Sequence, residues 1–220
     1  MTAFEELMDI CKQAAHDRNA CTEGYAALLR AETVPQILAV WRNNWQDVYV
    51  SRYHDIIADN IEMLERDEYR PLFHESQMYV NESSDVGLVI VSNPKQPVTI
   101  GGRAVGYIFG GGSLTATDNA EAHCRSEEGK LLLQGHATGF MEAGRAEVTE
   151  FALLQGVFDG ECHDAARVTI SGGRLRDYGH LEISAWRDAT VYSDIRKKIT
   201  LYGDEARLLP LADYNKEEAQ

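Results

Sequence analysis

The sequence predicts an α+β protein in which a small N-terminal helical cap is followed by a β-solenoid, a repeat domain of short strands wound around a narrow core. Apolar residues recur with a helical period up to about residue 70 and with a period of two from Met78 onward. Positions that face inward in the second region are mostly small. The predicted domains are 1–76 (helical), 77–210 (β-solenoid) and 211–220 (a flexible tail), and an antiparallel β-sandwich is the alternative.

The helical part begins with a capping signal. Thr2 followed by Glu5 has the form of a capping box, and an apolar stripe of helical spacing follows it. A second short helix begins near Tyr25. Thr33, with Pro35 and Gln36 after it, starts a third helix. The apolar stripe of this third helix is Ile37, Val40, Trp41, Trp45 and Val48. A fourth helix carries Tyr53, Ile57, Ile61 and Leu64.

The helical region is predicted to end at Arg70-Pro71, because the residue before a proline is pushed out of helical geometry. Many short segments of alternating pattern then follow, and none is long enough to favour a helix. They are VGLVIVS, PVTIGG, SLTAT, AEAHC, KLLLQG, AEVTEF, ARVTIS, HLEISA, ATVYSD and ITLYGD.

The stretch GHLEISAWRDATVYSD (179–194) repeats its own pattern after eight residues, and ATVYSD and ITLYGD are offset by ten. Both offsets are even, so the same side chains keep facing inward. With three strands in each coil, the region forms about five coils with a total rise of about 24 Å. A narrow coil has room only for small inward side chains, namely Ala122, Cys124, Ala146, Ala166, Ala185 and Ala189.

The open ends of a solenoid expose unpaired strand edges and need covers. At the N-terminal end, the helical region is predicted to dock through Trp41 and Trp45. At the other end, Leu208, Leu209 and Leu211 around Pro210 are the candidates.

Composition excludes several classes of function. The chain has 220 residues and a net charge of −14, so nucleic-acid phosphates should repel it. No apolar run is long enough to cross a bilayer, and the acidic start MTAFEELMD does not resemble a secretory signal. The scattered Cys11, Cys21, Cys124 and Cys162 indicate reduced thiols, which predicts a cytoplasmic protein.

Motifs that could carry chemistry are weak. The glycine cluster FGGGS (109–113) lacks the lysine and the helix of a phosphate loop, so it is interpreted as a corner between coils, as are Gly101-Gly102 and Gly172-Gly173. His123-Cys124 and Cys162-His163 could suggest a metal site. However, neighbours on a strand point to opposite faces, so the thiols should lie inside and the imidazoles outside. No metal, cofactor or catalytic residue is predicted.

Two sets of surface residues are candidates for binding. The first is predicted to form outward ladders, Thr190 above Thr200 and Tyr192 above Tyr202, with Trp186 and Arg187 at a nearby turn. The second is an acidic, solvated face. Its members are Asp118, Glu121, Asp164, Asp188 and Asp194.

A resemblance adds context. NACTEGYAALL, followed by a helical segment and by repeats of the DATVYS type, resembles uncharacterised phage and prophage proteins of gut bacteria. These proteins carry a short ACxEG helical segment before strand repeats rich in alternating Ala and Val. The resemblance implies a phage-encoded protein in a bacterial host and implies no chemistry.

The functional expectation is a non-enzymatic, acidic binding protein of the counter-defence inhibitor type. It would occupy a basic surface on a host protein, for example one that handles nucleic acid, by electrostatic complementarity. One alternative is a virion or assembly component that self-associates, so homo-oligomers are allowed. The other is a small solenoid enzyme that acts on glycans or nucleotides.

Overall fold

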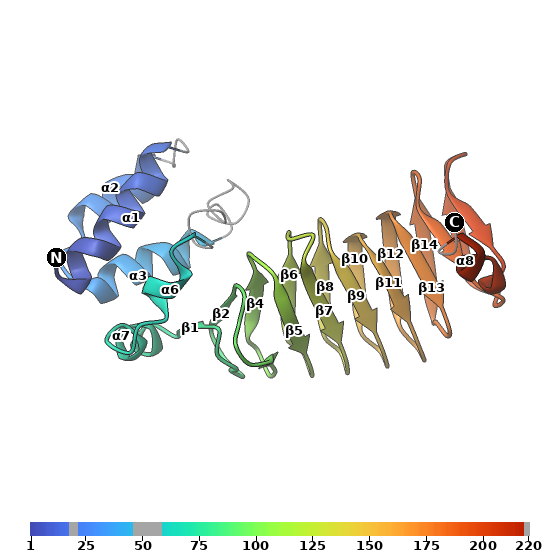
Figure 1. Ribbon diagram of the computed structural model, residues 1–220, viewed down its shortest axis with the longest axis horizontal. Coiled ribbons are helices and arrows are strands. Elements are labelled where there is room, and N and C mark those ends of the chain that lie inside the picture. The colour runs from blue at the N-terminus through green and yellow to red at the C-terminus, as the bar shows by residue number, and fades with distance from the viewer. Residues whose placement is uncertain (18–21, 46–58, 218–220) are drawn as a thin grey trace.

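A computed structural model describes residues 1–17, 22–45 and 59–217 of the chain. Figure 1 shows a helical region at the N-terminal end and a stack of strands that extends along the long axis of the molecule. The predicted order of a helical cap and a β-solenoid is confirmed. Every pair of neighbouring strands is parallel, so the antiparallel sandwich is not formed.

The helical region is built on two capping boxes. Thr2 N–H donates to Glu5 Oε2 (2.8 Å) and Glu5 N–H donates to Thr2 Oγ1 (3.3 Å), as predicted. Thr33 and Gln36 make the second box. Pro71 does not end the region but lies in the first turn of a further short helix, where its missing N–H costs nothing. The helices are α1 (Ala3–Asp17), α2 (Thr22–Arg30), α3 (Val34–Asn43), α6 (Ile61–Leu64) and α7 (Arg70–Glu75).

The strands form two parallel sheets that face each other across the core. Sheet A has nine strands and sheet B has eight, so the region forms about eight coils. Sheet A is formed by β1 (Met78–Val80), β2 (Leu88–Val91), β4 (Val105–Ile108), β6 (Glu121–Cys124), β8 (Thr138–Met141), β10 (Leu153–Val157), β12 (Arg167–Gly172), β14 (Glu182–Trp186) and β16 (Ile199–Tyr202).

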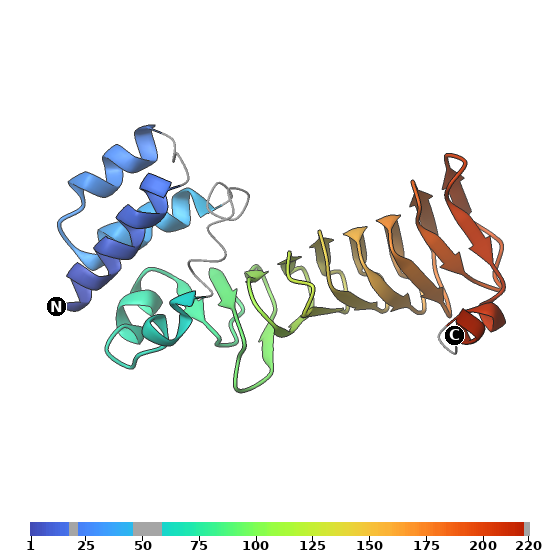
Figure 2. The same cartoon turned by 45° about the horizontal axis from the view of Figure 1, so that its top comes forward.

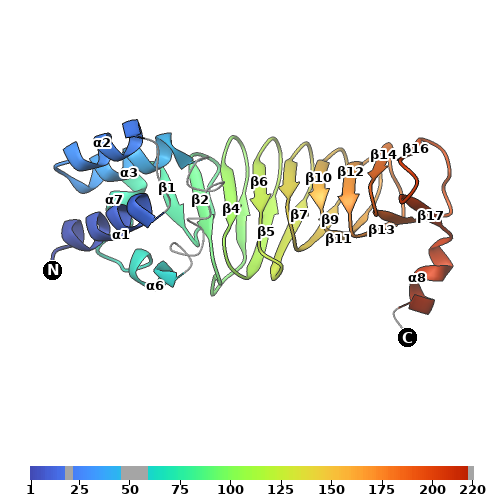
Figure 3. The same cartoon turned by 90° about the horizontal axis from the view of Figure 1, so that it is seen from above.

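The chain alternates between the two sheets, as the view from above shows (Figure 3). Each coil therefore has two strands, and the prediction of three strands and about five coils is wrong. One coil takes 14 to 17 residues, since Leu153 pairs with Arg167 and Leu88 with Val105. Sheet B is formed by β3 (Val98–Ile100), β5 (Gly112–Ala116), β7 (Gly129–Leu133), β9 (Arg145–Val148), β11 (Asp159–Cys162), β13 (Arg174–Asp177), β15 (Thr190–Tyr192) and β17 (Arg207–Leu209).

The interior between the sheets is thin, and the two sheets fill it unequally. A β-carbon on Gly106 of sheet A would lie 2.6 Å from Leu114 Cδ2 of sheet B, and one on Gly139 would lie 2.4 Å from Leu133 Cδ1. Leucines of sheet B therefore occupy the space that glycines of sheet A leave. The small residues predicted to face inward are all buried: Ala122, Cys124, Ala146, Ala166, Ala185 and Ala189.

The corner that leads from sheet B to sheet A is nearly constant. Five successive corners each hold one residue in the left-handed region, such as Asp118 (φ 56°) and Asp164 (φ 60°), followed two positions later by a buried alanine. The alanine N–H donates to the carbonyl three residues earlier, for example Ala120 to Thr117 (3.0 Å). These corners are residues 101–104, 117–120, 134–137, 149–152 and 163–166.

The helical region docks onto the first coils, and the predicted role of the two tryptophans is confirmed. Trp41 and Trp45 are buried in a cluster that joins the helices to β1, β2 and β4. The Trp45 ring meets Tyr107 edge-on at 5.9 Å and Phe109 at 5.5 Å. Since Tyr107 lies on the outer face of sheet A, the helices cover that face as well as the first edge.

The C-terminal end differs from the expected flexible tail 211–220 as far as residue 217, and residues 218–220 lie outside the described residues. Residues 211–217 form helix α8 (Leu211–Glu217), which Figure 2 shows at the far end of the stack. Tyr214 is buried and packs edge-on against Tyr192 at 5.0 Å. Leu208 and Leu209 lie in the last strand, β17, rather than across the end of the stack.

Within the part of the chain that the structure describes, no helix has both the length and the apolar character that crossing a bilayer requires.

Candidate functional site

An aromatic column runs along the outer face of sheet A. Tyr107, His123 and Phe140 occupy equivalent positions on three successive strands, β4, β6 and β8. The rings of Tyr107 and His123 stack at 4.5 Å with planes 10° apart, and those of His123 and Phe140 at 5.0 Å and 21°. In-register parallel pairing places like side chains one above another, so the backbone itself sets the spacing of the column.

The column continues as a polar row on the following strands. Gln155, Thr169, Ser184 and Thr200 hold the same outward position on β10, β12, β14 and β16. A shallow hollow of about 330 Å³ opens between the aromatic and polar parts. Its lining includes His123, Phe140, Gln155 and Thr169. The face therefore offers flat rings, hydroxyls and an amide on one rigid surface.

A second aromatic pair lies at the far end of the same face. Trp186 and Tyr202 stack at 3.9 Å with planes only 7° apart, and they are 43% and 40% exposed. The pairing of β14 with β16 places them side by side. Trp186 was predicted at a turn and lies at the end of β14, with Arg187 in the corner after it.

His123 is electrostatically distinct within the column. Its Nε2 donates to Glu121 Oε1 at 2.6 Å, and only 17% of its side chain is exposed. Burial lowers the pKa of His123 below its ordinary value, although the hydrogen bond and the charge of Glu121 act in the opposite direction. Burial, with a smaller contribution from Glu121, raises the pKa of Tyr107 to about 12. Both rings are therefore uncharged at neutral pH.

The outer face of sheet B has a different character, because its charges pair across neighbouring strands. Arg174 contacts Asp159 at 3.1 Å, Arg176 pairs with Glu161, and Lys130 lies 3.6 Å from Glu147. The ring of Tyr214 in α8 lies 4.5 Å from the Arg176 guanidinium. Most of the charge on this face is thus matched within the protein.

The prediction of ladders between ATVYSD and ITLYGD is wrong. β15 and β16 belong to different sheets, so Thr190 is not above Thr200 and Tyr192 is not above Tyr202. Tyr192 is 1% exposed and lies under α8, which removes it from any binding surface. The offset of ten between these segments is shorter than one coil, and for this reason it could not bring them into register.

The five predicted acidic residues do not form one face. Asp118 and Asp164 lie at the constant corners, and Glu121 lies on the outer face of sheet A. Asp188 is in the corner after β14, and Asp194, whose Oδ1 accepts from Leu211 N–H at 3.2 Å, is in the corner after β15. Four of the five acidic residues therefore lie at the borders between the two sheets, and Glu121 lies on the outer face of sheet A.

The cysteine and histidine pairs follow the predicted alternation. Cys124 and Cys162 are buried in the core, whereas His123 and His163 face outward. Burial raises the pKa of Cys124 to about 11 and that of Cys162 further, so both are thiols. Among the described residues, no group of three or more His, Cys, Asp or Glu side chains is arranged to hold a metal ion. Cys21 lies outside the described residues.

A buried polar cluster in the last coils was not foreseen. Asp177 occupies an inward position of β13, where the preceding coils have apolar side chains or a cysteine, and it is 1% exposed. Its carboxylate accepts from Gly179 N–H (3.0 Å) and from the Ser193 hydroxyl, and it contacts His180 Nδ1 at 2.8 Å. The carboxylate lies between the serine and the histidine, so the histidine cannot deprotonate the serine, and the cluster stabilises the core instead.

No protein-family model matches the sequence, and comparisons with curated proteins and with solved structures give no significant match.

Proposed function

We propose that the protein is a non-catalytic binding protein that presents the outer face of sheet A to a partner protein. The observation that supports this proposal is the concentration of stacked aromatic rings on that face. Phe140, Trp186 and Tyr202 are all at least 36% exposed there, on strands held rigid by parallel pairing. Rigid aromatic side chains lose little entropy when a partner covers them, and they dominate the energy of protein interfaces.

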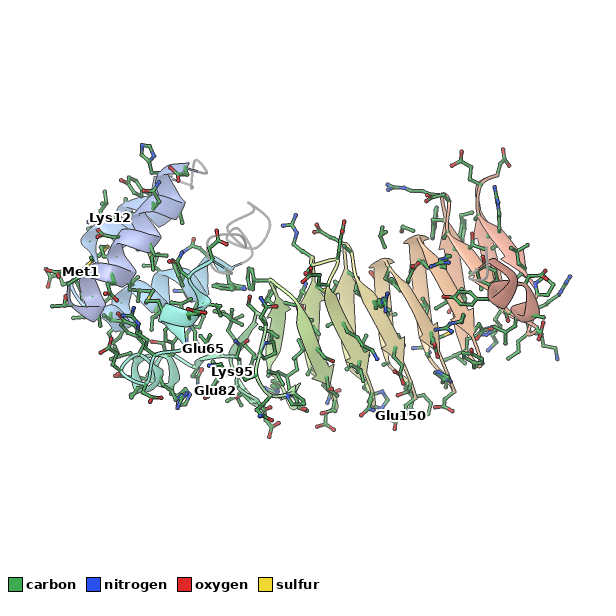
Figure 4. The ribbon with its side chains drawn as sticks, in the orientation of Figure 1. Met1, Lys12, Glu65, Glu82, Lys95 and Glu150 are labelled. Atoms are coloured by element: carbon green, nitrogen blue, oxygen red, sulfur yellow. The ribbon has the colours of Figure 1, made fainter. Side chains whose placement is uncertain are left out.

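The borders of the face suggest the chemistry of the partner. Exposed carboxylates lie at both ends of the strands of sheet A. Asp118, Glu150 and Asp164 are in corners that lead into the sheet, and Glu127 and Asp188 are in corners that lead out of it. Figure 4 shows Glu150 at the lower edge of the stack. A face with exposed aromatic rings and an acidic rim suits a partner with a basic rim, because rim charges steer association and select partners.

This arrangement is compatible with the counter-defence role expected from the sequence. A host protein that handles nucleic acid carries a basic surface, and a chain with a net charge of −14 would be attracted to it. The binding energy would come from the exposed aromatic rings and the rate of association from the acidic rim.

The test uses the immobilised full chain and a bacterial lysate. A double variant of the face, Phe140→Ser with Trp186→Ser, is compared with a matched control, Phe151→Ser with Tyr178→Ser. The control removes two rings that are also exposed, 59% and 48%, but lie off the outer face of sheet A. A basic protein should be retained by the wild type and the control, and its affinity for the face variant should fall about 30-fold or more.

Salt dependence gives an independent criterion. Retention should weaken when ionic strength rises from about 0.1 M toward 1 M, where the Debye length falls from about 10 Å to 3 Å. The proposal is contradicted if the face variant and the control retain the basic protein equally, or if its retention does not change with salt concentration.

Self-association is a second candidate function, and the last coil favours it. Leu201 lies in an inward column, paired with Ala185, yet it is 39% exposed because β16 is the last described strand of sheet A and no strand pairs with its outer edge. An open, apolar solenoid end with unpaired backbone groups is a template for pairing with another chain. Light scattering should then give a mass above 24.6 kDa that Leu201→Lys reduces to the monomer. A wild-type chain that is monomeric at high concentration excludes this role.

A further inference from the structure

A hollow of about 530 Å³ lies between the C-terminal end of α3 and the first strands of sheet A. Side chains that line it include Arg42, Asn44, Trp45, Arg103 and Tyr107, and we call it the α3 hollow. Its volume is within the range of about 300–1,000 Å³ that is typical of small-molecule sites. We propose that the α3 hollow binds a small organic anion through the oxygens of a carboxylate or a phosphate.

The first support is a buried donor without an acceptor. Trp45 is 4% exposed, and its indole Nε1–H has no hydrogen-bond partner among the described residues. The ring is held by its edge-on contacts with Tyr107 and Phe109, so the N–H cannot turn toward another acceptor. Native proteins rarely leave such a group unpaired, and a ligand that accepts this hydrogen bond would satisfy it.

The second support is the charge of the lining. Among the described residues, neither Arg42 nor Arg103 has a carboxylate partner, although the chain has 35 acidic residues. Within the described part of the chain, Arg42 donates one side-chain hydrogen bond, from Nη1 to the carbonyl of Ser76 at 2.9 Å. Of the described residues that line the α3 hollow, none is Asp or Glu. The hollow is therefore a locally basic, donor-rich site in an acidic protein.

These groups define the ligand class. Guanidinium and indole N–H groups can only donate, so the ligand must supply acceptors, and a negative charge strengthens each bond. Carboxylates and phosphates both present planar or forked oxygens that match arginine. The inference does not rest on the proposed protein partner, because a small anion can be tested alone.

The experiment follows the indole N–H of Trp45 by two-dimensional NMR in the ¹⁵N-labelled full chain. The chain has three tryptophans, and Trp45→Phe identifies the signal by its loss while an aromatic ring is kept. Inorganic phosphate and acetate are titrated separately, with chloride added to keep ionic strength constant. We expect a saturable shift of the Trp45 signal with one or both probes, and the probe that binds more tightly identifies the anionic group.

Two arginine variants separate a built site from general charge attraction. Arg103→Gln removes one guanidinium of the α3 hollow and should weaken the dissociation constant about tenfold, a change of about 1.4 kcal/mol. Arg145→Gln removes the same charge from the outer end of β9 in sheet B and should leave binding unchanged. Both positions are exposed, so neither substitution should disturb folding.

Three results would overturn the proposal. One is a Trp45 signal that does not move at about 10 mM of either probe, since that excludes dissociation constants near 1 mM. Another is a shift that grows linearly without saturation. The third is equal weakening by Arg103→Gln and Arg145→Gln, which would assign the effect to net charge alone.

Discussion

Sheet A and sheet B are built by the same chain in alternating strands, and yet they differ on both of their surfaces. Inside, sheet B contributes Leu114, Leu131 and Leu133, whereas the facing part of sheet A contributes Gly106 and Gly139. Outside, sheet B carries ion pairs and the covering helix α8, while sheet A carries stacked rings and open hollows.

The difference shows that the two sheets of one solenoid can serve different purposes. In-register parallel pairing places equivalent positions of successive coils in one column. The same kind of side chain can therefore recur at that position along the whole stack. Sheet B uses its columns to fill the core and to neutralise its own charge. In the inward column of Gly106, Ala122 and Gly139, sheet A contributes little side-chain volume, and its outer columns remain available for contacts with other molecules.

The largest expected effect tests the interior part of this comparison. Leu133→Ala should lower the free energy of unfolding by about 2–5 kcal/mol, because it leaves a cavity in a thin core. Gly139→Ala alone should cost about 1–3 kcal/mol by overpacking, since the new β-carbon meets Leu133. The double variant should cost clearly less than the sum, as the added methyl enters the vacated space.

Urea unfolding followed by circular dichroism measures all three variants. Leu132→Ala, on the outer side of the same strand β7, is the matched control and should cost about 1 kcal/mol or less. Strictly additive losses would show that the leucine of sheet B and the glycine of sheet A do not share one space.

A smaller effect tests the aromatic column through pH. Because the pKa of folded His123 lies below its ordinary value of 6.5, the unfolded chain binds this proton more readily. His123 therefore costs no stability above that value, and stability is progressively lost as the pH falls through 6.5 and below. His123→Gln should make the unfolding free energy less dependent on pH in this window.

The control for this prediction is His136→Gln, at an exposed corner where the imidazole stacks on Phe151. It removes an imidazole that lies outside the aromatic column. A profile that is equally steep in His123→Gln and in the wild type would contradict the role given to burial at the column.

The smallest effect concerns the ion pairs of sheet B. Glu147→Gln breaks the contact with Lys130 at 3.6 Å, in which both side chains are more than 40% exposed. The loss should be at most about 0.5 kcal/mol and should vanish in high salt. Thermal unfolding at two salt concentrations checks this, and a loss that persists at high salt would show that the pair is not merely a surface contact.

Much of the fold follows from local pattern. A period of two determines which side chains of a strand face inward, and this does not depend on which strands pair. The buried alanines and cysteines and the outward histidines were predicted for this reason. Pairing partners depend instead on where the chain bends. The repeat of eight residues, which relates Ile183 to Val191, is half a coil that joins sheet A to sheet B. The repeat gives the step from one strand to the next but not the number of strands in a coil, and the structure has two in place of the three expected.

The candidate site was harder to foresee than the fold. Tyr107, His123 and Phe140 are separated by a whole coil each, so they become neighbours only when the coil length is known. Two of them lie in strands, VGYI and TGFM, whose inward glycine hides the apolar alternation. The repeated buried alanines, from Ala104 to Ala166, would have revealed the coil length. Trp186 was predicted as a surface residue, but not its stacking on Tyr202.

The constant corner between sheet B and sheet A also determines how this architecture can change length. Strand positions on both sides of residues 117–120, 134–137 and 149–152 are equivalent, so a segment that runs from one such corner to the next is a self-contained module. Removing or duplicating that module would preserve alignment everywhere else. The opposite corners range from the long connection 92–97 to the single residue Phe158. Insertions that add new features are therefore accommodated on that side, without interrupting the stack.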